Sequence, residues 1–416
     1  MLNTATFSPL KNRTFALLVT GSLLANLGNT IQSVGAAWHL TQLGQPADVV
    51  ALAQTAYNLP IMLLALPAGA WSDMVDKKLL LQISLLLMLA VSIVLVVMVE
   101  MGLAGPVAII GLTALLACGV ACIIPAAASA VNFAVPRGQL AAAVALNILG
   151  FNVARSFGPA LGGMVTSIGG AGAAFAVNGA AYALVILLLW RWRLDAPKPE
   201  KRKIGPVMAE GLRYAFASKP IRTIMLRAIT FTSTGAAAWA IMPLFSSQVL
   251  GEGSFIYGLL LAALGVGAVI GAASATWFRS RFSAEVITRV SGMIYGTGCV
   301  LVALQPALWT IMLLLVMAGA GWVQALSGFA VSGQMWSPQK LVGRIAALVS
   351  SVTFGGIAIG SWLWGHFADA HGITTAFITS GIAMILLPLL GLIFRMPDHA
   401  DAQPDDRSSA QSAAKI

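Results

Sequence analysis

The sequence predicts an all-α membrane protein with twelve transmembrane helices in two pseudo-symmetric six-helix bundles. Three observations support this fold class. The 416 residues are 58% hydrophobic and only 9% charged, whereas a soluble domain carries about 25% charged residues. Twelve apolar runs are each long enough to cross a bilayer. Finally, short motifs of the first half of the chain recur in the second half.

The predicted spans are apolar runs of roughly 20 residues or more. They are residues 14–40, 49–71, 79–99, 106–134, 140–167, 171–190, 221–250, 255–278, 285–304, 308–332, 343–367 and 374–394. The first run follows Lys11 and Arg13 and lacks an obvious small-residue cleavage site. It is therefore predicted to be a membrane span and not a signal peptide.

The positive charges support this segmentation. All of the 24 lysines and arginines except Arg155 fall near one side of the predicted membrane, in the two termini and around the loops that follow even-numbered spans. By the positive-inside rule, that side faces the cytoplasm together with both termini. The net charge of +10 therefore reflects topology and contact with membrane lipids, and no nucleic-acid partner is expected.

A repeat divides the chain into two similar halves. One constant offset pairs Gly158 with Gly360 and Gly163 with Gly365, as expected after duplication of a six-span unit. Such repeats form two bundles that can rock around a central site. We expect bundles at residues 1–192 and 221–395, a cytoplasmic linker at 193–220 and a disordered cytoplasmic tail at 396–416.

Two motifs lie at the ends and faces of these spans. After the second span, Gly69 is followed by Asp73 and by the basic pair Lys77 and Lys78, so that a small residue precedes an acidic and then a basic turn. On the fifth span, small residues spaced by four predict one smooth face for close helix packing, and a proline permits a bend. This helix-packing motif comprises Gly150, Ala154, Gly158, Pro159, Gly162 and Gly163.

The two motifs resemble motif A and motif C of the major facilitator superfamily. The stretch from Ala145 to Pro159 is more narrowly similar to the exporter branch that contains enterobactin exporters and macrolide-efflux proteins. The resemblance covers essentially the whole chain. It implies a monomeric secondary transporter of the bacterial inner membrane that exports a small organic molecule, such as a siderophore or a drug-like compound, by alternating access.

The resemblance also implies a gate on the cytoplasmic side. Asp73 would latch this side closed in the outward-open state, with Arg344 at the start of the eleventh span as its candidate ionic partner. The positive N-terminal end of that helix would add to the attraction. The predicted gating residues are Gly69, Asp73, Lys77, Lys78 and Arg344. The alternative is that Asp73 is an ordinary solvated loop charge.

Polar side chains within the apolar spans predict a substrate-binding cavity. Asn26, Asn29 and Ser33 form one stripe of a helix, and amides with nearby aromatic rings suit hydrogen bonding and stacking. The predicted substrate-binding residues are Asn26, Asn29, Ser33, Gln54, Asn58, Arg155, Trp239 and Gln324. The alternative for each is a polar contact between helices.

Arg155 lies roughly midway along the fifth span, where an unpaired arginine costs about 2.5 kcal/mol or more. It could attract an anionic or carbonyl-rich substrate, or it could tie its helix to Asn152 or Asn29. No acidic residue is predicted at mid-membrane. This favours neutral or anionic substrates over lipophilic cations.

The expected source of energy is the proton gradient, with protons as the candidate coupling ion. The chain has no Walker A pattern for ATP. The fourth span carries no charge, and His39, near the outer end of the first span, is the candidate proton carrier. The alternative is an interfacial histidine beside Trp38.

Other classes of protein are less well supported. No zinc-protease motif, nucleophile elbow or paired-cysteine motif is present, so we expect no enzyme, no cofactor and no metal site. A nutrient or metabolite importer of the same fold remains the main alternative, followed by a membrane-embedded sensor.

Overall fold

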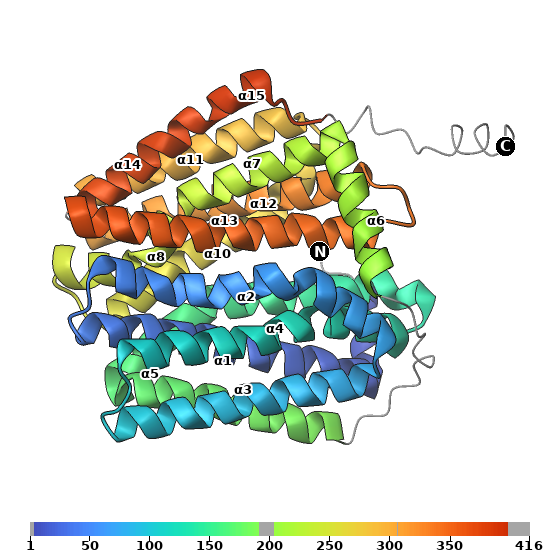
Figure 1. Ribbon diagram of the computed structural model, residues 1–416, viewed down its shortest axis with the longest axis horizontal. Coiled ribbons are helices and arrows are strands. Elements are labelled where there is room, and N and C mark those ends of the chain that lie inside the picture. The colour runs from blue at the N-terminus through green and yellow to red at the C-terminus, as the bar shows by residue number, and fades with distance from the viewer. Residues whose placement is uncertain (1–3, 191–203, 306, 398–416) are drawn as a thin grey trace, which may run out of the picture.

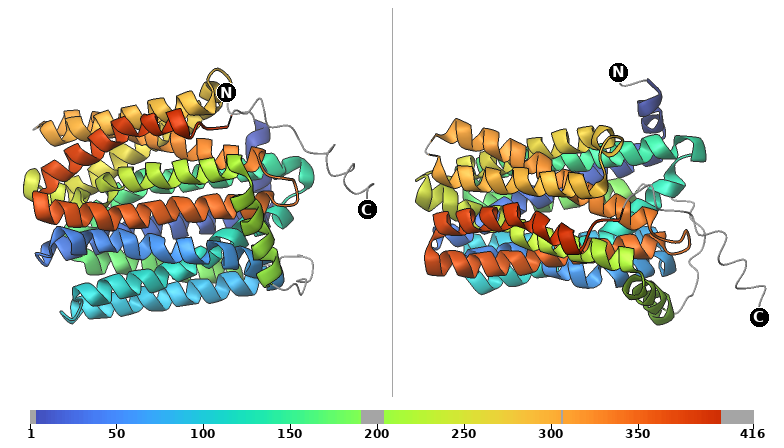
Figure 2. Two further views of the ribbon diagram at one scale, coloured as in Figure 1. Left: turned by 45° about the horizontal axis from the view of Figure 1, so that its top comes forward. Right: turned by 90° about the horizontal axis from the view of Figure 1, so that it is seen from above.

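The computed structural model describes residues 4–190, 204–305 and 307–397. Within these ranges the protein is almost entirely helical, and no strand occurs. The long helices run side by side in two bundles, the first coloured blue to green and the second yellow-green to red (Figure 1). The two further views show the same packing from other sides (Figure 2).

The first bundle contains six spans in five long helices. A short helix, η1 (Thr4–Lys11), precedes it, and η2 (Arg137–Gln139) joins two of its members. The long helices are α1 (Arg13–Gln42), α2 (Ala47–Met74), α3 (Lys77–Glu100), α4 (Pro106–Ala134) and α5 (Leu140–Trp190). The last of these contains the predicted fifth and sixth spans, which turn at Gly170, where φ is 69°.

The second bundle contains six further spans, two of which are interrupted. Its seventh span is broken into α7 (Lys219–Gly235), α8 (Ala237–Ala240), α9 (Met242–Leu244) and the π-helix η3 (Phe245–Val249). The next four spans are α10 (Ser254–Arg279), α11 (Ala284–Leu304), α12 (Leu308–Met335) and α13 (Val342–His371). The last consists of α14 (Ile373–Leu386), η4 (Leu387–Leu389) and α15 (Leu390–Ile393).

The structure confirms the predicted twelve spans. In the described part of the chain, 10 helical segments are long and apolar enough to cross a membrane. One of these, α5, makes two spans, and the broken seventh span completes the twelve. Large apolar side chains on the outside, such as Val107, Ile168 and Trp309, are more than four-fifths exposed, as expected for surfaces that face lipid.

The two ends of the molecule differ in how the chain turns. We call the end at which α6 (Ile204–Ala217) crosses the bundles the linker end, and the opposite end the hairpin end (Figure 1). Five loops at the hairpin end contain a glycine with positive φ, namely Gly44, Gly102, Gly170, Gly251 and Gly372. Only glycine adopts this left-handed conformation without steric cost, so these short reversals depend on it.

At the linker end, side chains cap the starts of helices. The carboxylate of Asp76 accepts a hydrogen bond from the backbone N–H of Leu79 at 2.9 Å and begins α3. Asn12 does the same for α1 through the N–H of Thr14, also at 2.9 Å. Such caps satisfy backbone donors that have no partner inside the helix.

The internal repeat reappears in the packing. A Cβ atom at Gly158 would lie 1.9 Å from the hydroxyl oxygen of Thr30 on α1, and one at Gly360 would lie 2.2 Å from the backbone oxygen of Ser233 on α7. The two glycines thus provide the same close contact between the first and fifth spans of each half. This agrees with duplication of one bundle.

The linker contains an ordered helix. Residues 193–203 of the expected linker lie outside the described residues, but α6 contacts α2, α7 and α13. Gly211 and Ala215 on this helix are buried. The expected linker therefore includes a helix that packs on both bundles at the linker end.

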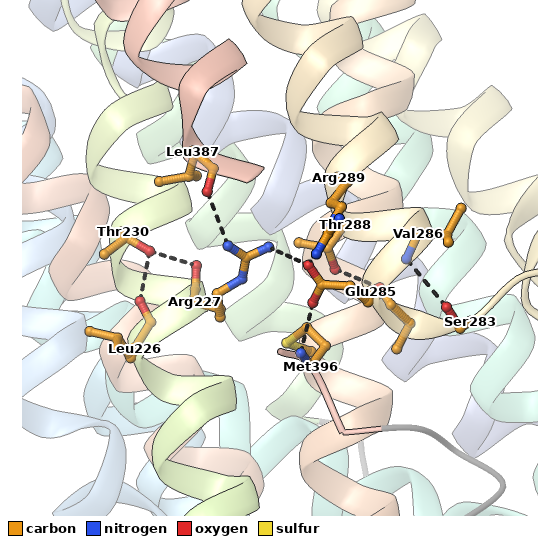
Figure 3. Close-up of polar contacts among 11 residues, drawn as sticks. Leu226, Arg227, Thr230, Ser283, Glu285, Val286, Thr288, Arg289, Leu387 and Met396 are labelled. Atoms are coloured by element: carbon orange, nitrogen blue, oxygen red, sulfur yellow. Dashed lines mark hydrogen bonds and ion pairs between the residues drawn. The ribbon is translucent and has the colours of Figure 1, made fainter. Parts of the chain in front are cut away.

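The start of the expected disordered tail is also ordered. The backbone N–H of Met396 donates to Glu285 Oε2 at 2.7 Å, and its residue is only 2% exposed. The other carboxylate oxygen of Glu285 pairs with Arg289 at 2.5 Å and with the buried Arg227 at 3.5 Å (Figure 3). The expectation that disorder begins at residue 396 is therefore wrong. Residues 398–416 lie outside the described part.

A candidate substrate cavity between the bundles

A cavity of about 210 Å³ lies between the two bundles, near the middle of the long helices. Helices α1, α2 and α5 line it from the first bundle, and α8, α10, α12 and α13 line it from the second. Its lining residues are Asn26, Asn29, Thr30, Ser33, Val34, Gln54, Tyr57, Asn58, Phe151, Ala154, Arg155, Pro159, Trp239, Tyr257, Leu261, Trp322, Phe354 and Ile357.

Most residues predicted to bind substrate come together here. The members that line the cavity are Asn26, Asn29, Ser33, Gln54, Asn58, Arg155 and Trp239. Two amides also fold back on their own helices: Asn26 Nδ2 donates to the Ser22 carbonyl and Asn58 Nδ2 to the Gln54 carbonyl, each at 2.7 Å. Within the described residues their amide oxygens accept no hydrogen bond, so they can accept one from a substrate in the cavity.

Gln324 does not line the cavity. Its Nε2 donates to Ser274 Oγ at 3.0 Å, so the side chain joins α12 to α10 within the second bundle. Two residues earlier on α12, Trp322 lines the cavity instead. Because two residues correspond to about 200° of helix rotation, the two side chains point to opposite faces. The placement of Gln324 in the cavity is therefore wrong.

Arg155 reaches across the interface between the bundles. Its guanidinium carbon lies 5.1 Å from the ring centre of Trp239 on α8, a cation–π contact. Within the described residues, no acidic side chain pairs with it. No hydrogen bond joins Arg155 to Asn152 or Asn29 in the described part of the chain: Asn152 Nδ2 donates to the Ile148 carbonyl, and Asn29 Oδ1 accepts from the Tyr182 hydroxyl.

The backbone around Arg155 packs closely on the other bundle. Pro159 has no N–H, so the Arg155 carbonyl lacks its usual helical donor. A Cβ at Gly265 of α10 would lie 2.6 Å from this carbonyl oxygen. Ser156 Oγ donates to the Gly265 carbonyl at 2.9 Å. The crossing of α5 and α10 thus holds Arg155 at the level of the cavity.

An aromatic cluster forms the wall on the side of the second bundle. The ring centres of Trp239 and Trp322 are 6.3 Å apart, and Tyr295 and Phe231 pack on Trp322 at 5.2 and 5.5 Å. The Tyr295 hydroxyl donates to the Gly235 carbonyl at 2.6 Å. This hydrogen bond anchors the cluster where the seventh span is broken.

The sequence did not predict a buried polar network behind Asn29. Gln32 Oε1 accepts hydrogen bonds from Asn178 Nδ2 at 2.6 Å and Ser92 Oγ at 3.1 Å. Asn178 Nδ2 also contacts the Tyr182 hydroxyl, which in turn donates to Asn29 Oδ1. The i, i+4 spacing of Asn178 and Tyr182 in an apolar run was the available signal, and together these bonds orient Asn29 toward the cavity.

The bundles close on each other at the hairpin end. Gly163 on α5 meets Gly258 on α10, where a Cβ at Gly163 would lie 2.9 Å from the Gly258 Cα. On the other side, Gly365 on α13 meets Ala51 on α2, and Trp38 stacks on Tyr257 at 6.1 Å. Backbone contacts this close leave no space for a solute.

Polar contacts reinforce this closure. His366 Nδ1 lies 4.0 Å from Asp48 Oδ2, and Asp369 Oδ1 accepts from the Ala47 backbone N–H at 3.4 Å. Both pairs join α13 to the start of α2. They form an inter-bundle contact that the sequence alone did not predict.

The helix-packing motif divides its contacts between two neighbours. Gly158 and Gly162 meet α1 closely, and Ala154 is buried, whereas Gly163 meets the opposite bundle. At Gly150 a Cβ would have only an ordinary contact, 3.9 Å from Leu23. The smooth face thus begins one turn later than the spacing suggests.

The predicted gating residues lie at the linker end. The side chain of Asp73 lies outside the described part, although its backbone belongs to the last turn of α2. Arg344 pairs with Glu210 on α6.

The two lysines of the motif contact other helices of the first bundle. Lys77 lies 5.3 Å from the ring centre of Phe133, and Lys78 Nζ donates to the Trp190 carbonyl at 3.4 Å. Around Gly69 a Cβ would meet no atom of the described residues within 4 Å, so this glycine makes no close helix contact in this conformation.

His39 lies apart from the cavity. Its Nε2 is 3.1 Å from the Ala104 carbonyl, in the loop between α3 and α4. The ring thus joins two hairpin-end segments of the first bundle.

The fold and cavity define a class of protein. Two six-helix bundles with a polar and aromatic cavity between them are typical of membrane transporters that move small molecules. The family profile described as "Transmembrane secretion effector" matches residues 4–415. The chain therefore belongs to this family of the major facilitator superfamily. It is a multi-pass transporter of small molecules and not an enzyme.

Three curated relatives are similar to the chain in sequence. The chain is 26% identical over 392 residues to the multidrug efflux pump Tap of Mycolicibacterium fortuitum, covering 90% of this chain and 94% of Tap. It is 22% identical to the staphyloferrin A transporter of Staphylococcus aureus, and the match covers 89% of this chain and 94% of that transporter. It is 26% identical to the enterobactin exporter EntS of Salmonella choleraesuis, covering 62% of each chain.

Solved structures resemble the chain in fold. A bacterial homolog of the human lysosomal transporter Spinster, in an inward-facing and unoccupied conformation, matches with a TM-score of 0.70, 16% identity and coverage of 95% of this chain and 96% of that one. The D-xylose-proton symporter matches with a TM-score of 0.73 and 14% identity, and the match covers 94% of this chain and 99% of the symporter. These likenesses extend to the fold alone.

Proposed function

We propose that the protein is a secondary active transporter that exports a small organic molecule, a siderophore or a drug-like compound, from the bacterial cytoplasm. The observation that carries this proposal is the cavity, which residues of both bundles line and which lies below a closed hairpin end. Rocking of the bundles about this site would expose it to each side in turn.

Export is favoured over import by the relatives. Two of them are named as an efflux pump and an enterobactin exporter, and the glycine-proline element of α5 resembles that of antiporters. An importer of nutrients or metabolites, built on the same fold, is the second candidate.

The orientation and energy source complete the proposal. The lysines and arginines that gather at the linker end support, by the positive-inside rule, a cytoplasmic location for that end and for both termini. The protein would act as a monomer in the inner membrane and use the proton gradient. Asp73 and Arg344 would close the cytoplasmic side in the outward-open state, with His39 as a candidate carrier of protons.

The test measures the content of siderophores, macrolides and organic acids in an efflux-deficient bacterial host by mass spectrometry. Cells with and without the protein are compared before and after an uncoupler. Export predicts that one compound falls only when the protein is present and recovers with the uncoupler. A rise in that compound would instead indicate import. No change, despite verified membrane expression, would contradict the proposal for these compounds.

A further inference from the structure

The cavity contains one formal charge. Among its lining residues in the described chain, only Arg155 is charged at neutral pH, and none is Asp, Glu, Lys or His. Acidic side chains of the described residues lie instead at the two ends of the molecule. Asp48 on α2 is at the hairpin end, and Glu285 on α11 is at the linker end. A cation in the cavity would therefore meet the positive charge of Arg155 with no acidic group to balance it.

Hydrogen-bond donors without partners point the same way. A guanidinium has five N–H donors and no acceptor, and Arg155 contacts only the face of Trp239 among the interactions of the described residues. Donor-only groups of this kind are satisfied by the oxygens of a carboxylate, sulfonate or phosphate.

The rings around Arg155 add a second preference. Trp239 and Trp322 both line the cavity, and their ring centres lie only 6.3 Å apart. Trp239 is only half-buried and can contact a planar part of the substrate beside Arg155, whereas Trp322 is 1% exposed and supports Trp239 from within the aromatic cluster. The cavity therefore suits a molecule that combines an acidic group with a planar or aromatic group.

We propose that the transported substrate is such an organic anion, that Arg155 neutralises it in the cavity, and that the membrane potential is the part of the proton gradient that drives its export. This inference rests on the proposed export function. It differs from coupling through a proton carrier, because none of the described lining residues is a carboxylic acid or a histidine.

The direction of the driving force follows from the charges. With a substrate that carries one negative charge, the loaded cavity is neutral, and the empty cavity carries the positive charge of Arg155. The loaded step outward moves no net charge, and the empty return step moves one positive charge inward. Each cycle therefore transfers one net negative charge outward. The inside-negative potential of a bacterium favours this movement. One elementary charge crossing 100 mV corresponds to an outward concentration ratio of about 50-fold.

The first test is binding to the purified protein. Sulforhodamine B, a net anion, and rhodamine 6G, a cation, share one planar scaffold, and fluorescence polarisation measures the binding of both. We expect the wild type to prefer the anion. Arg155→Ala should weaken anion binding at least tenfold, and Arg155→Lys should restore part of it.

The matched control is Arg281→Ala. This change removes an arginine that stacks on Trp277 at 4.2 Å, away from the cavity, so it should leave both dyes unaffected. Stronger binding of rhodamine 6G than of the anion would contradict the inference. Equal anion binding by the wild type and Arg155→Ala, or failure of sulforhodamine B to bind, would also contradict it.

The second test is transport into proteoliposomes. A potassium gradient with valinomycin imposes an inside-positive potential at equal pH, and a pH gradient with the potential clamped to zero is the comparison. We expect sulforhodamine B uptake to follow the potential and not the pH gradient. Uptake that follows only the pH gradient, or uptake of rhodamine 6G alone, would overturn the inference while leaving the transporter function intact. Failure of the cellular export test would instead remove the proposed function itself.

Discussion

Gly163 illustrates how one residue decides whether the two bundles can touch. A Cβ at this position would lie 2.5 Å from the backbone oxygen of Ser254 and 2.9 Å from the Cα of Gly258. These neighbours are backbone atoms, which cannot move aside as a flexible side chain can. The closure of the hairpin end on this side therefore requires glycine.

We predict that Gly163→Val prevents this closure and lowers transport at least tenfold without lowering expression. Labelling of a cysteine introduced near the hairpin end, such as Ser254→Cys, would report the opening as faster modification. Gly111→Ala is the control, because a Cβ there would meet no atom within 4 Å. Normal transport by Gly163→Val would mean that this contact is not needed for the transport cycle.

Tyr182 acts on the cavity through another residue. Its hydroxyl donates to Asn29 Oδ1 and accepts from Asn178 Nδ2, so Tyr182→Phe leaves the buried Asn178 and the half-buried Asn29 each short of one partner. Each unsatisfied group costs about 1–3 kcal/mol. We expect a lower unfolding temperature and a raised KM with a smaller change in kcat, measured by thermal unfolding in detergent and by transport assays. An unchanged KM would show that the network does not position Asn29.

At the scale of elements, Glu285 joins three segments of the second bundle. Its carboxylate pairs with Arg227 of α7 and Arg289 of α11, and it accepts the N–H of Met396 (Figure 3). Removing the anion of a buried pair leaves an uncompensated charge, which costs about 3–5 kcal/mol.

Glu285→Gln should therefore lower the stability of the second bundle by about this amount. Thermal unfolding in detergent, followed by circular dichroism, measures the loss. Glu252→Gln, an exposed carboxylate in the loop before α10, removes the same charge and should have little effect. Equal stability of the two variants would indicate that the arginines are satisfied by other groups.

Glu210 on the linker helix α6 takes the place predicted for Asp73 as the ionic partner of Arg344. In this structure Arg344 pairs with Glu210 of α6, while the resemblance assigns it to Asp73. Both pairings fit one cycle if Arg344 exchanges partners as the linker end closes. We predict that Asp73→Asn lowers transport while membrane expression, checked by immunoblot, is unchanged. Wild-type transport rates in this variant would remove the latch.

At the scale of the whole molecule, closure of the hairpin end should exclude access to the cavity from that end. Asp48 and His366 come from different bundles, and their side-chain atoms approach within 4.0 Å. A pair of cysteines at these two positions, in a background without Cys118, Cys122 and Cys299, should hold this end shut when joined by a short cross-linker.

Cross-linking of the Asp48→Cys, His366→Cys pair is expected to reduce transport to background, and a cleavable cross-linker should allow recovery after reduction. Each single variant treated in the same way is the control. Transport that continues in fully cross-linked protein would contradict alternating access at this end.

Prediction succeeded where the signal was local to the chain. The twelve spans followed from apolar length, and Asn26, Asn29 and Ser33 reached one cavity because their spacing places them on one face of α1. Gln324 was misplaced because a polar residue in a span can face a cavity or another helix, and its spacing does not distinguish the two. Here Ser274 of α10 provides its partner.

The sequence by itself determined that the chain spans the membrane twelve times, in two related halves, with its positive charges on one side. These properties depend on hydrophobicity and charge, which each segment carries alone. Only the tertiary structure decided that Arg155 contacts Trp239, that Asp48 meets His366, and that Arg344 pairs with Glu210. These contacts join residues from separate helices, and they depend on the rotation and depth of each helix after packing, which no single segment encodes.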